Sequence, residues 1–334
     1  MTERQRFFFV TGCDSGFGKI ITELLSEDER NVVYAGCYLE KSMDELKRGL
    51  GENVVPVLLD VTSDESVAKA TERIRNHIGS DRGLDGLVNN AGILVTPGPV
   101  EWTPISAYRR MLDVNLIGMA RVTKAVLPLL RRGRGRIVNI ASIAGRVGLP
   151  TQSAYCASKY AVEGYSEVLR KEMLPWGVTV HVIEPGVFKQ TGLYGTWKKG
   201  YEANYDDLPE DVKRDYGRTF YKRTWEGMSK TLDLPIGNND PASVPRAMLH
   251  ALTSESPKYR YRVGNDSKYI ITPLTWTSEA TQDWVLASGK NVPEAAPRDG
   301  RNAALRRYET NYFSYYVAAA AALAYWVIRR GSRL

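Results

Sequence analysis

The chain has 334 residues, 43% hydrophobic and 25% charged, a globular composition with enough apolar residues for a sizeable core. The net charge of +7 is scattered. Its local arginine-rich run at residues 131–136 falls between a predicted helix and a predicted strand, which favours a solvated loop over a site for nucleic acid or anionic lipid. Cys13, Cys37 and Cys156 have no metal-ligand spacing and indicate reduced thiols, which excludes a disulfide framework.

Apolar runs that favour β-structure alternate with helical patterns through most of the chain. Strands are predicted at residues 7–11, 32–37, 54–59, 84–89, 136–141, 178–183 and 259–263. Helices are predicted at residues 18–25, 63–78, 105–130, 151–174 and 241–252. This alternation predicts a Rossmann-type α/β fold, a doubly wound parallel sheet with its ligand crevice at the carboxyl ends of the strands. We expect residues 1–300 to form this single domain.

Residues 190–240 break the alternation. They combine many charges with aromatic side chains at positions 194, 197, 201, 205, 216, 220, 221 and 225. We predict a helical insertion whose aromatic inner face forms a lid over an apolar substrate. The alternative is an ordinary packed subdomain.

Residues 301–334 are predicted to form a tail with a candidate membrane helix at residues 312–328. That stretch has no charged residue, aromatic residues gather at both its ends, and Arg329, Arg330 and Arg333 follow it. As a helix it spans about 26 Å, near the lower limit for crossing a bilayer. We expect a hydrophobic C-terminal helix that anchors the chain; the alternative is a helix packed on the body or at a subunit interface. Because residues 1–12 run into a strand, we expect no signal peptide.

A glycine-rich turn joins the first predicted strand to the first helix. Gly12, Gly16 and Gly18 lie there, together with Ser15 and Phe17. Glycine lets the backbone approach a pyrophosphate closely, and the helix N-terminus supplies N–H donors and a positive dipole. The turn therefore predicts a dinucleotide site.

Polar residues also follow later strands. Asp60 precedes Val61 after the third strand, where an acid can meet an adenine amino group. Residues 89–92 (Asn-Asn-Ala-Gly) close the fourth strand, and Ser142 follows the fifth. These ends converge at one edge of a parallel sheet.

The helix predicted at residues 151–174 carries Tyr155 and Lys159 four residues apart, on one face. An ammonium beside a phenol favours the phenolate, so we expect Lys159 to lower the pKa of Tyr155 from about 10 toward working pH. Such a tyrosine can exchange a proton with an alcohol or carbonyl oxygen.

Together these motifs resemble the short-chain dehydrogenase/reductase family, over about residues 5–290. Family members have TGxxxGxG, a DV pair, NNAG, a helix asparagine, a serine, YxxxK and a PG turn in that order. This chain has each of them, with Asn115 as the helix asparagine and Pro185-Gly186 as the turn. Longer strings, such as VTGCDSGFG and VIEPGVF, resemble the branch of retinol dehydrogenases, 17β-hydroxysteroid dehydrogenases and D-3-hydroxybutyrate dehydrogenases.

The resemblance implies roles for individual residues. Tyr155 is the general acid/base, and Ser142 holds the substrate oxygen near it, so both bind substrate. Lys159 lowers the tyrosine pKa and holds the nicotinamide ribose, and Asn115 joins a water relay to the lysine. The implied cofactor-binding residues are Gly12, Ser15, Gly16, Phe17, Gly18, Asp60, Val61, Asn89, Ala91, Gly92, Tyr155, Lys159, Pro185, Gly186, Val187 and Thr191.

The choice of cofactor depends on the end of the second strand, where an acid selects a free ribose 2′-hydroxyl and an arginine suits a 2′-phosphate. Residues 37–41 contain no arginine, and Glu40 comes slightly late. NAD is therefore favoured over NADP. Many family members have a threonine four residues after the PG glycine; here Gln190 stands at that position, and Thr191 follows it.

We predict an NAD(P)-dependent oxidoreductase that interconverts a hydroxyl and a carbonyl on a lipophilic substrate, with a steroid or retinoid favoured. One alternative is D-3-hydroxybutyrate oxidation, for which Lys189 is a candidate cation. Another, of a different class, is a non-catalytic dinucleotide-binding scaffold; the complete set of Ser142, Tyr155, Lys159 and Asn115 argues against it.

Assembly and location are predicted more coarsely. The family implies homo-oligomers formed through the helices that carry Asn115 and Tyr155. The tail favours the endoplasmic reticulum membrane, with the mitochondrion or the cytoplasm as alternatives. His77, His181 and His250 have no ligand-spaced partners, so no metal is expected.

Overall fold

Seven parallel strands form one sheet in the order β3-β2-β1-β4-β5-β6-β7. The computed structural model describes residues 4–95, 97–189, 194–195, 197–232, 240–286 and 293–296. The strands are β1 (Arg6–Thr11), β2 (Asn31–Cys37), β3 (Val54–Leu58), β4 (Gly86–Asn89), β5 (Arg136–Ile140), β6 (Thr179–Pro185) and β7 (Arg260–Val263). All seven predicted strands are confirmed. The order reverses between β1 and β4, and in such sheets ligands bind at that switch point.

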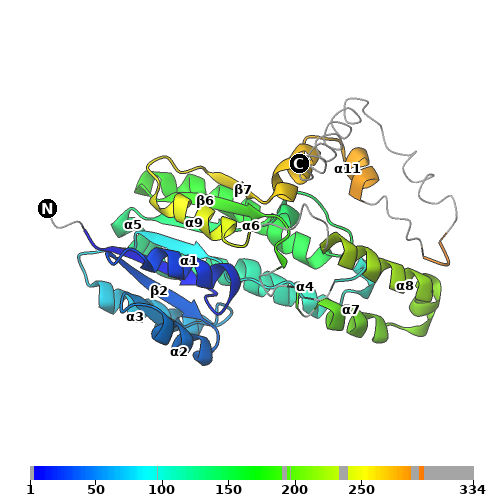
Figure 1. Ribbon diagram of the computed structural model, residues 1–334, viewed down its shortest axis with the longest axis horizontal. Coiled ribbons are helices and arrows are strands. Elements are labelled where there is room, and N and C mark those ends of the chain that lie inside the picture. Colours follow the sequence, from blue (N-terminus) through cyan, green and yellow to red (C-terminus); the bar gives the residue numbers. More distant parts are fainter. Residues whose placement is uncertain are drawn as a thin grey trace, which may run out of the picture.

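Helices cover both faces of the sheet (Figure 1). Alternate residues of β1 show why: Phe7 and Phe9 pack in the cluster shared with α3, α5 and α6, whereas Phe8 and Val10 pack with α1, α2 and α9. This two-sided burial confirms the predicted Rossmann-type fold. The helices are α1 (Gly16–Ser26), α2 (Glu40–Gly49), α3 (Asp64–Ile78), α4 (Ile105–Leu112), α5 (Met119–Gly133), α6 (Ser153–Met173), α7 (Trp197–Asp206), α8 (Glu210–Leu232), α9 (Ser243–Thr253), α10 (Thr272–Leu274) and α11 (Glu279–Leu286).

The helix predicted at residues 105–130 is continuous but not uniform. A π-helical segment, Asp113–Gly118, joins α4 to α5 and contains Asn115. Single turns of π-helix occur often at functional sites because they redirect one side chain within an otherwise regular helix. The helix α2 was not predicted from the sequence.

The insertion consists of α7 and α8, which lie side by side and project from the sheet (Figure 1). Its aromatic side chains surround Trp102, whose ring centre lies 5.6 Å from that of Tyr201, 5.3 Å from Tyr205 and 5.8 Å from Phe220. The predicted helical insertion is thus confirmed. The candidate membrane helix at residues 312–328 lies outside the described residues. Within the described ranges, no helix is both long and apolar enough to cross a membrane.

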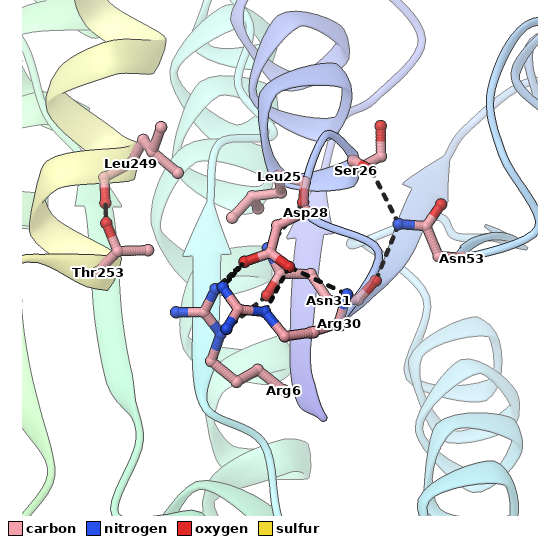
Figure 2. A network of polar contacts seen from close by, with 9 residues as sticks. All are labelled: Arg6, Leu25, Ser26, Asp28, Arg30, Asn31, Asn53, Leu249 and Thr253. Atoms are coloured by element: carbon pink, nitrogen blue, oxygen red, sulfur yellow. Dashed lines mark hydrogen bonds and ion pairs between the residues drawn. The ribbon is translucent and has the colours of Figure 1, made fainter. Parts of the chain in front are cut away.

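Polar contacts fix the amino-terminal edge of the sheet, shown in Figure 2. Arg6 donates to Asn31 at 2.9 Å and to Asp28 at 2.8 Å, which ties the start of β1 to the start of β2. Asn53, just before β3, donates to the carbonyls of Ser26 and Asn31 at 3.0 and 3.1 Å. These bonds set the register of β1, β2 and β3, and therefore also the relative position of their carboxyl ends.

Candidate active site

A cavity of about 1610 Å³ opens at the carboxyl ends of the strands. We call the part lined by residues 12, 14–17, 38–39, 59–62 and 90–93 the glycine arm. The part lined by residues 149–152, α7 and α8 is the aromatic arm. The predicted site residues that line the cavity are Gly12, Ser15, Gly16, Phe17, Asp60, Val61, Ala91, Gly92, Ser142, Tyr155, Lys159, Pro185, Gly186 and Val187.

The glycine-rich turn is shaped by two residues that tolerate no side chain. Gly12 has φ +71°, and a Cβ there would lie 2.8 Å from the Cα of Ala91. A Cβ on Gly18 would lie 2.1 Å from the carbonyl oxygen of Gly12, although Gly18 itself does not line the cavity. Close packing of α1 on the turn therefore depends on glycine at both positions. The first helical residues, Gly16 and Phe17, form part of the cavity wall.

Asn89 and Asn90, two neighbouring residues at the end of β4, have side chains with different hydrogen-bond partners. Asn90 donates to the carbonyls of Thr11 and Gly12, both at 3.0 Å, so it holds the glycine-rich turn. Asn89 donates instead to Thr123 and Asn139, both at 2.9 Å, and does not line the cavity. The pleat of β4 turns the Asn89 side chain toward α5 and β5 and away from the glycine-rich turn, and its assignment to the cofactor site stays a prediction.

The hydroxyls of Ser142 and Tyr155 meet at the junction of the two arms. Ser142 follows β5, Tyr155 lies in the first turn of α6, and both are buried but line the cavity. Burial raises the pKa of Tyr155 to about 12, and a hydrogen bond with the Ser142 side chain opposes the shift. Near neutral pH the phenol is therefore protonated.

Lys159 lies one turn further along α6. Its ammonium is 5.7 Å from the centre of the Tyr155 ring and donates to the Ile140 carbonyl at 2.8 Å. Burial lowers the pKa of Lys159 to about 8, opposed by the charge of Glu163. In the protein chain alone burial raises the pKa of Tyr155, where the sequence predicts a value below 10. The lowering of this pKa by Lys159 stays a prediction.

Asn115 is fully buried behind the cavity, not in its wall. Its amide oxygen accepts from the Ile93 N–H at 2.8 Å. Its amide nitrogen donates to the Ile93 carbonyl and the Ser158 hydroxyl, both at 3.0 Å. The side chain thus ties the loop after β4 to α6, beside Lys159. The water relay implied by the resemblance stays a prediction.

A residue that sequence reasoning missed supports the turn after β6. Asp266 is 7% exposed, lines the cavity and accepts from the Val187 N–H at 2.6 Å. A Cβ on Gly186 would lie 1.9 Å from its carboxylate, so glycine is needed there. No local pattern points to Asp266, which lies 79 residues from Val187 in sequence. Thr191 and Gln190 lie outside the described residues.

The aromatic arm is lined by apolar, polar and charged side chains. They include Tyr194 and Trp197, whose ring centres are 4.8 Å apart, and Phe220 and Met228 of α8. Arg223, Thr224, Glu226 and Lys230 of α8 add polar and charged groups to this wall. Lys189 is exposed and is not among the described lining residues, so the suggested cation for a small carboxylate does not face the cavity. In the described part of the chain no three His, Cys, Asp or Glu side chains converge as metal ligands would.

Comparison with known proteins identifies the family. A model of the short chain dehydrogenases matches residues 6–202. The chain belongs to this family. A short-chain dehydrogenase of Streptomyces avermitilis superposes with a TM-score of 0.66 at 27% identity, covering 85% of this chain and 98% of that structure. A short chain dehydrogenase of Burkholderia cenocepacia, solved in complex with NADP, has a TM-score of 0.59 at 25% identity, covering 82% and 94%.

Curated short-chain dehydrogenases are more similar still. The 17-beta-hydroxysteroid dehydrogenase type 6 of Homo sapiens is 39% identical over 296 residues, which cover 88% of this chain and 91% of that protein. Retinol dehydrogenase 7 of Rattus norvegicus is 40% identical with the same coverage. The prediction of an oxidoreductase from this branch of the short-chain dehydrogenases is confirmed.

Proposed function

We propose that the protein is an NAD-dependent short-chain dehydrogenase that interconverts a hydroxyl and a carbonyl on a steroid, a retinoid or a lipophilic molecule of similar size. One observation carries the proposal. Ser142 and Tyr155, whose side chains interact, line the same cavity as the residues of the glycine arm and the aromatic arm. A dinucleotide in the first arm and an apolar alcohol in the second would therefore bring their reacting ends to the same two hydroxyls.

The glycine arm suits a dinucleotide. The turn at residues 12–17 precedes α1, and its glycines leave room for backbone to approach a pyrophosphate. Asp60 and Val61 would meet the adenine, Lys159 the nicotinamide ribose, and Pro185 to Val187 the carboxamide end. A nicotinamide cofactor held by these residues would supply the acceptor for the hydride of the carbinol carbon.

The residues of this chain handle the proton. In the reduction direction, the protonated Tyr155 donates to the carbonyl oxygen while the Ser142 hydroxyl holds that oxygen. In the oxidation direction, Tyr155 takes the proton from the substrate hydroxyl. Because the raised pKa keeps Tyr155 protonated near neutral pH, the form that donates in reduction is populated and the phenolate that oxidation needs is scarce. Positive charge near the phenol therefore matters more for oxidation. Lys159 supplies such a charge, and Asn115 fixes the backbone around it.

The chemistry of the aromatic arm favours a lipophilic substrate. Its wall offers aromatic and aliphatic contacts, among them Trp197, Phe220 and Met228. The names of the curated relatives, a hydroxysteroid dehydrogenase and retinol dehydrogenases, point the same way. A screen of purified protein with steroids, retinol and D-3-hydroxybutyrate tests this. Turnover of 3-hydroxybutyrate well above every lipophilic alcohol would contradict it.

The variant Tyr155→Phe tests catalysis against the scaffold alternative. It removes only the hydroxyl, so kcat should fall by about 10²- to 10⁴-fold while NADH still binds. Tyr160→Phe is the matched control, since Tyr160 lies on the same helix and is 46% exposed; its activity should equal that of the parent chain. If Tyr155→Phe keeps the full rate, the catalytic assignment is wrong.

Location and assembly complete the proposal. We infer membrane anchoring through residues 312–328, in the endoplasmic reticulum, from their apolar sequence. A chain truncated before Tyr312 should leave the membrane fraction. We also infer a homo-oligomer formed through α4, α5 and α6, supported by exposed apolar side chains: Ile117, in the π-helical segment between α4 and α5, is 48% exposed, and Val168 of α6 is 54% exposed. Light scattering of the purified protein measures its oligomeric state, and a monomer would contradict the inferred oligomer.

A further inference from the structure

Asp14 makes an unusual pair of contacts for a residue of the glycine-rich turn. Its two carboxylate oxygens accept hydrogen bonds from the backbone N–H groups of Tyr38 and Leu39, each at 2.9 Å. These residues follow β2, and Leu39 is the residue immediately before α2. The carboxylate therefore caps the turn that leads from β2 into α2, although Asp14 itself comes from the turn after β1.

This turn is the place where dinucleotide-binding sheets of this type distinguish the two cofactors. An acid at the end of the second strand ordinarily bonds the ribose 2′-hydroxyl, and a nearby arginine accommodates a 2′-phosphate. Here the strand is followed by Tyr38 and Leu39, which carry no charge. Among the described residues, Asp14, Tyr38 and Leu39 line the cavity and Glu40, the acid nearest in sequence, does not.

We propose that Asp14 is the residue that selects a dinucleotide with a free 2′-hydroxyl and rejects one with a 2′-phosphate. The proposal rests on the proposed dehydrogenase function and adds the group that sets its cofactor preference. Two adjacent backbone N–H groups before a helix are donors that a phosphate would use. Asp14 already occupies both, and its negative charge repels a second anion.

The carboxylate can also favour the ribose directly. A carboxylate offers about four acceptor positions, and the two backbone bonds leave capacity for a ribose hydroxyl. Its position is fixed by the sheet: Thr11 pairs with Gly36, and the Cys13 N–H donates to the Gly36 carbonyl at 2.9 Å. Burial raises the pKa of the nearby Cys37 thiol to about 12, and the negative charge of Asp14 adds to this rise.

Binding of NADH and NADPH to the full-length protein, followed by nicotinamide fluorescence without substrate, tests the proposal. The parent chain should bind NADH at least about tenfold more tightly than NADPH. Asp14→Asn keeps the shape and one acceptor but removes the charge. It should reduce the ratio of NADPH to NADH dissociation constants by about tenfold or more, mainly through tighter NADPH binding. Glu40→Gln, at an exposed acid that is the first residue of α2, is the matched control and should leave the ratio within about twofold.

The outcomes are distinguishable. A ratio that does not move in Asp14→Asn, or a parent chain that prefers NADPH, overturns the role of Asp14 and leaves the dehydrogenase proposal intact. If both affinities fall in equal proportion, Asp14 only shapes the turn and the proposal is likewise overturned. Failure of the parent chain to bind either cofactor overturns the proposed function itself. A gain in NADPH affinity cannot come from partial unfolding, so the expected result is independent of stability.

Discussion

The two arms of the cavity are built by different kinds of interaction. In the glycine arm, backbone groups and short polar side chains fix the geometry: Thr11 accepts from the N–H groups of Asn90 and Ala91 at 3.1 and 3.0 Å, and Asn90 returns bonds to the turn. The aromatic arm is supported by apolar packing: of the rings that pack around Trp102, Phe220 lines the cavity. The hydrogen bonds that shape the glycine arm are directional, whereas the apolar contacts that support the aromatic arm are not.

This difference predicts how each arm responds to change. Backbone-defined geometry leaves no room for an extra methyl group, because an atom in that position meets another backbone atom that cannot rotate away. Apolar packing tolerates a shape change if the volume is kept. We therefore expect substitutions in the glycine arm to affect every substrate equally. Substitutions in the aromatic arm should change which substrates bind.

Among substitutions that distinguish the two arms, the largest effect is expected from Gly18→Ala. The added Cβ would lie 2.1 Å from the Gly12 carbonyl oxygen, so α1 or the turn must move. A displacement of that size costs about 1–3 kcal/mol in stability, and kcat/KM should fall by about 10²-fold with any substrate. Steady-state kinetics with two unlike alcohols measures this. Gly164→Ala is the control: it lies in α6 with nothing within 4 Å of the new Cβ, and should be as active as the parent.

The same contrast explains what the sequence could predict. All seven strands follow from apolar runs bounded by turns, and most of the cofactor wall follows from glycines and polar residues at strand ends. The sequence could not decide between Asn89 and Asn90, because the strand pleat determines which side chain faces the turn. It also missed Asp14 and Asp266, whose partners are distant in sequence and depend on strand register. The pKa of Tyr155 depends on burial, which the Tyr-x-x-x-Lys spacing does not reveal.

An intermediate effect is expected from pH, because Lys159 lies where the arms meet. Burial lowers its pKa to about 8, below its unfolded value of about 10.4. Burying the ammonium therefore costs stability fully below pH 8, and the cost is relieved as pH rises from about 8 to about 10.4. Stability therefore rises with pH in this range, whereas the activity in ketone reduction should fall. We expect kcat/KM to fall by up to about tenfold per pH unit above pH 8, because Lys159 loses the positive charge that helps Tyr155 release its proton.

A substitution at Glu163 tests whether Lys159 causes this pH dependence. It lies one turn after Lys159 on α6, is 6% exposed, and is ion-paired with Arg260 of β7. Its charge raises the pKa of Lys159 against burial. Glu163→Gln should therefore shift the high-pH limb of the reduction profile to lower pH, with kcat at pH 6 little changed. A profile that does not move would mean that the limb belongs to another group.

The smallest effect is expected in the aromatic arm, at Met228 of α8. This side chain is half-buried, lines the cavity and accepts a hydrogen bond from the Thr151 hydroxyl at 3.2 Å. Met228→Ala removes apolar contact that the substrate has in both its ground state and its transition state. KM for a lipophilic alcohol should therefore rise by about fivefold, with kcat and the NADH dissociation constant unchanged. Met228→Leu, which keeps the volume, should restore KM to within about twofold. If Met228→Ala instead lowers kcat for every alcohol by the same factor, the two arms are mechanically coupled and α8 helps to position the reacting groups.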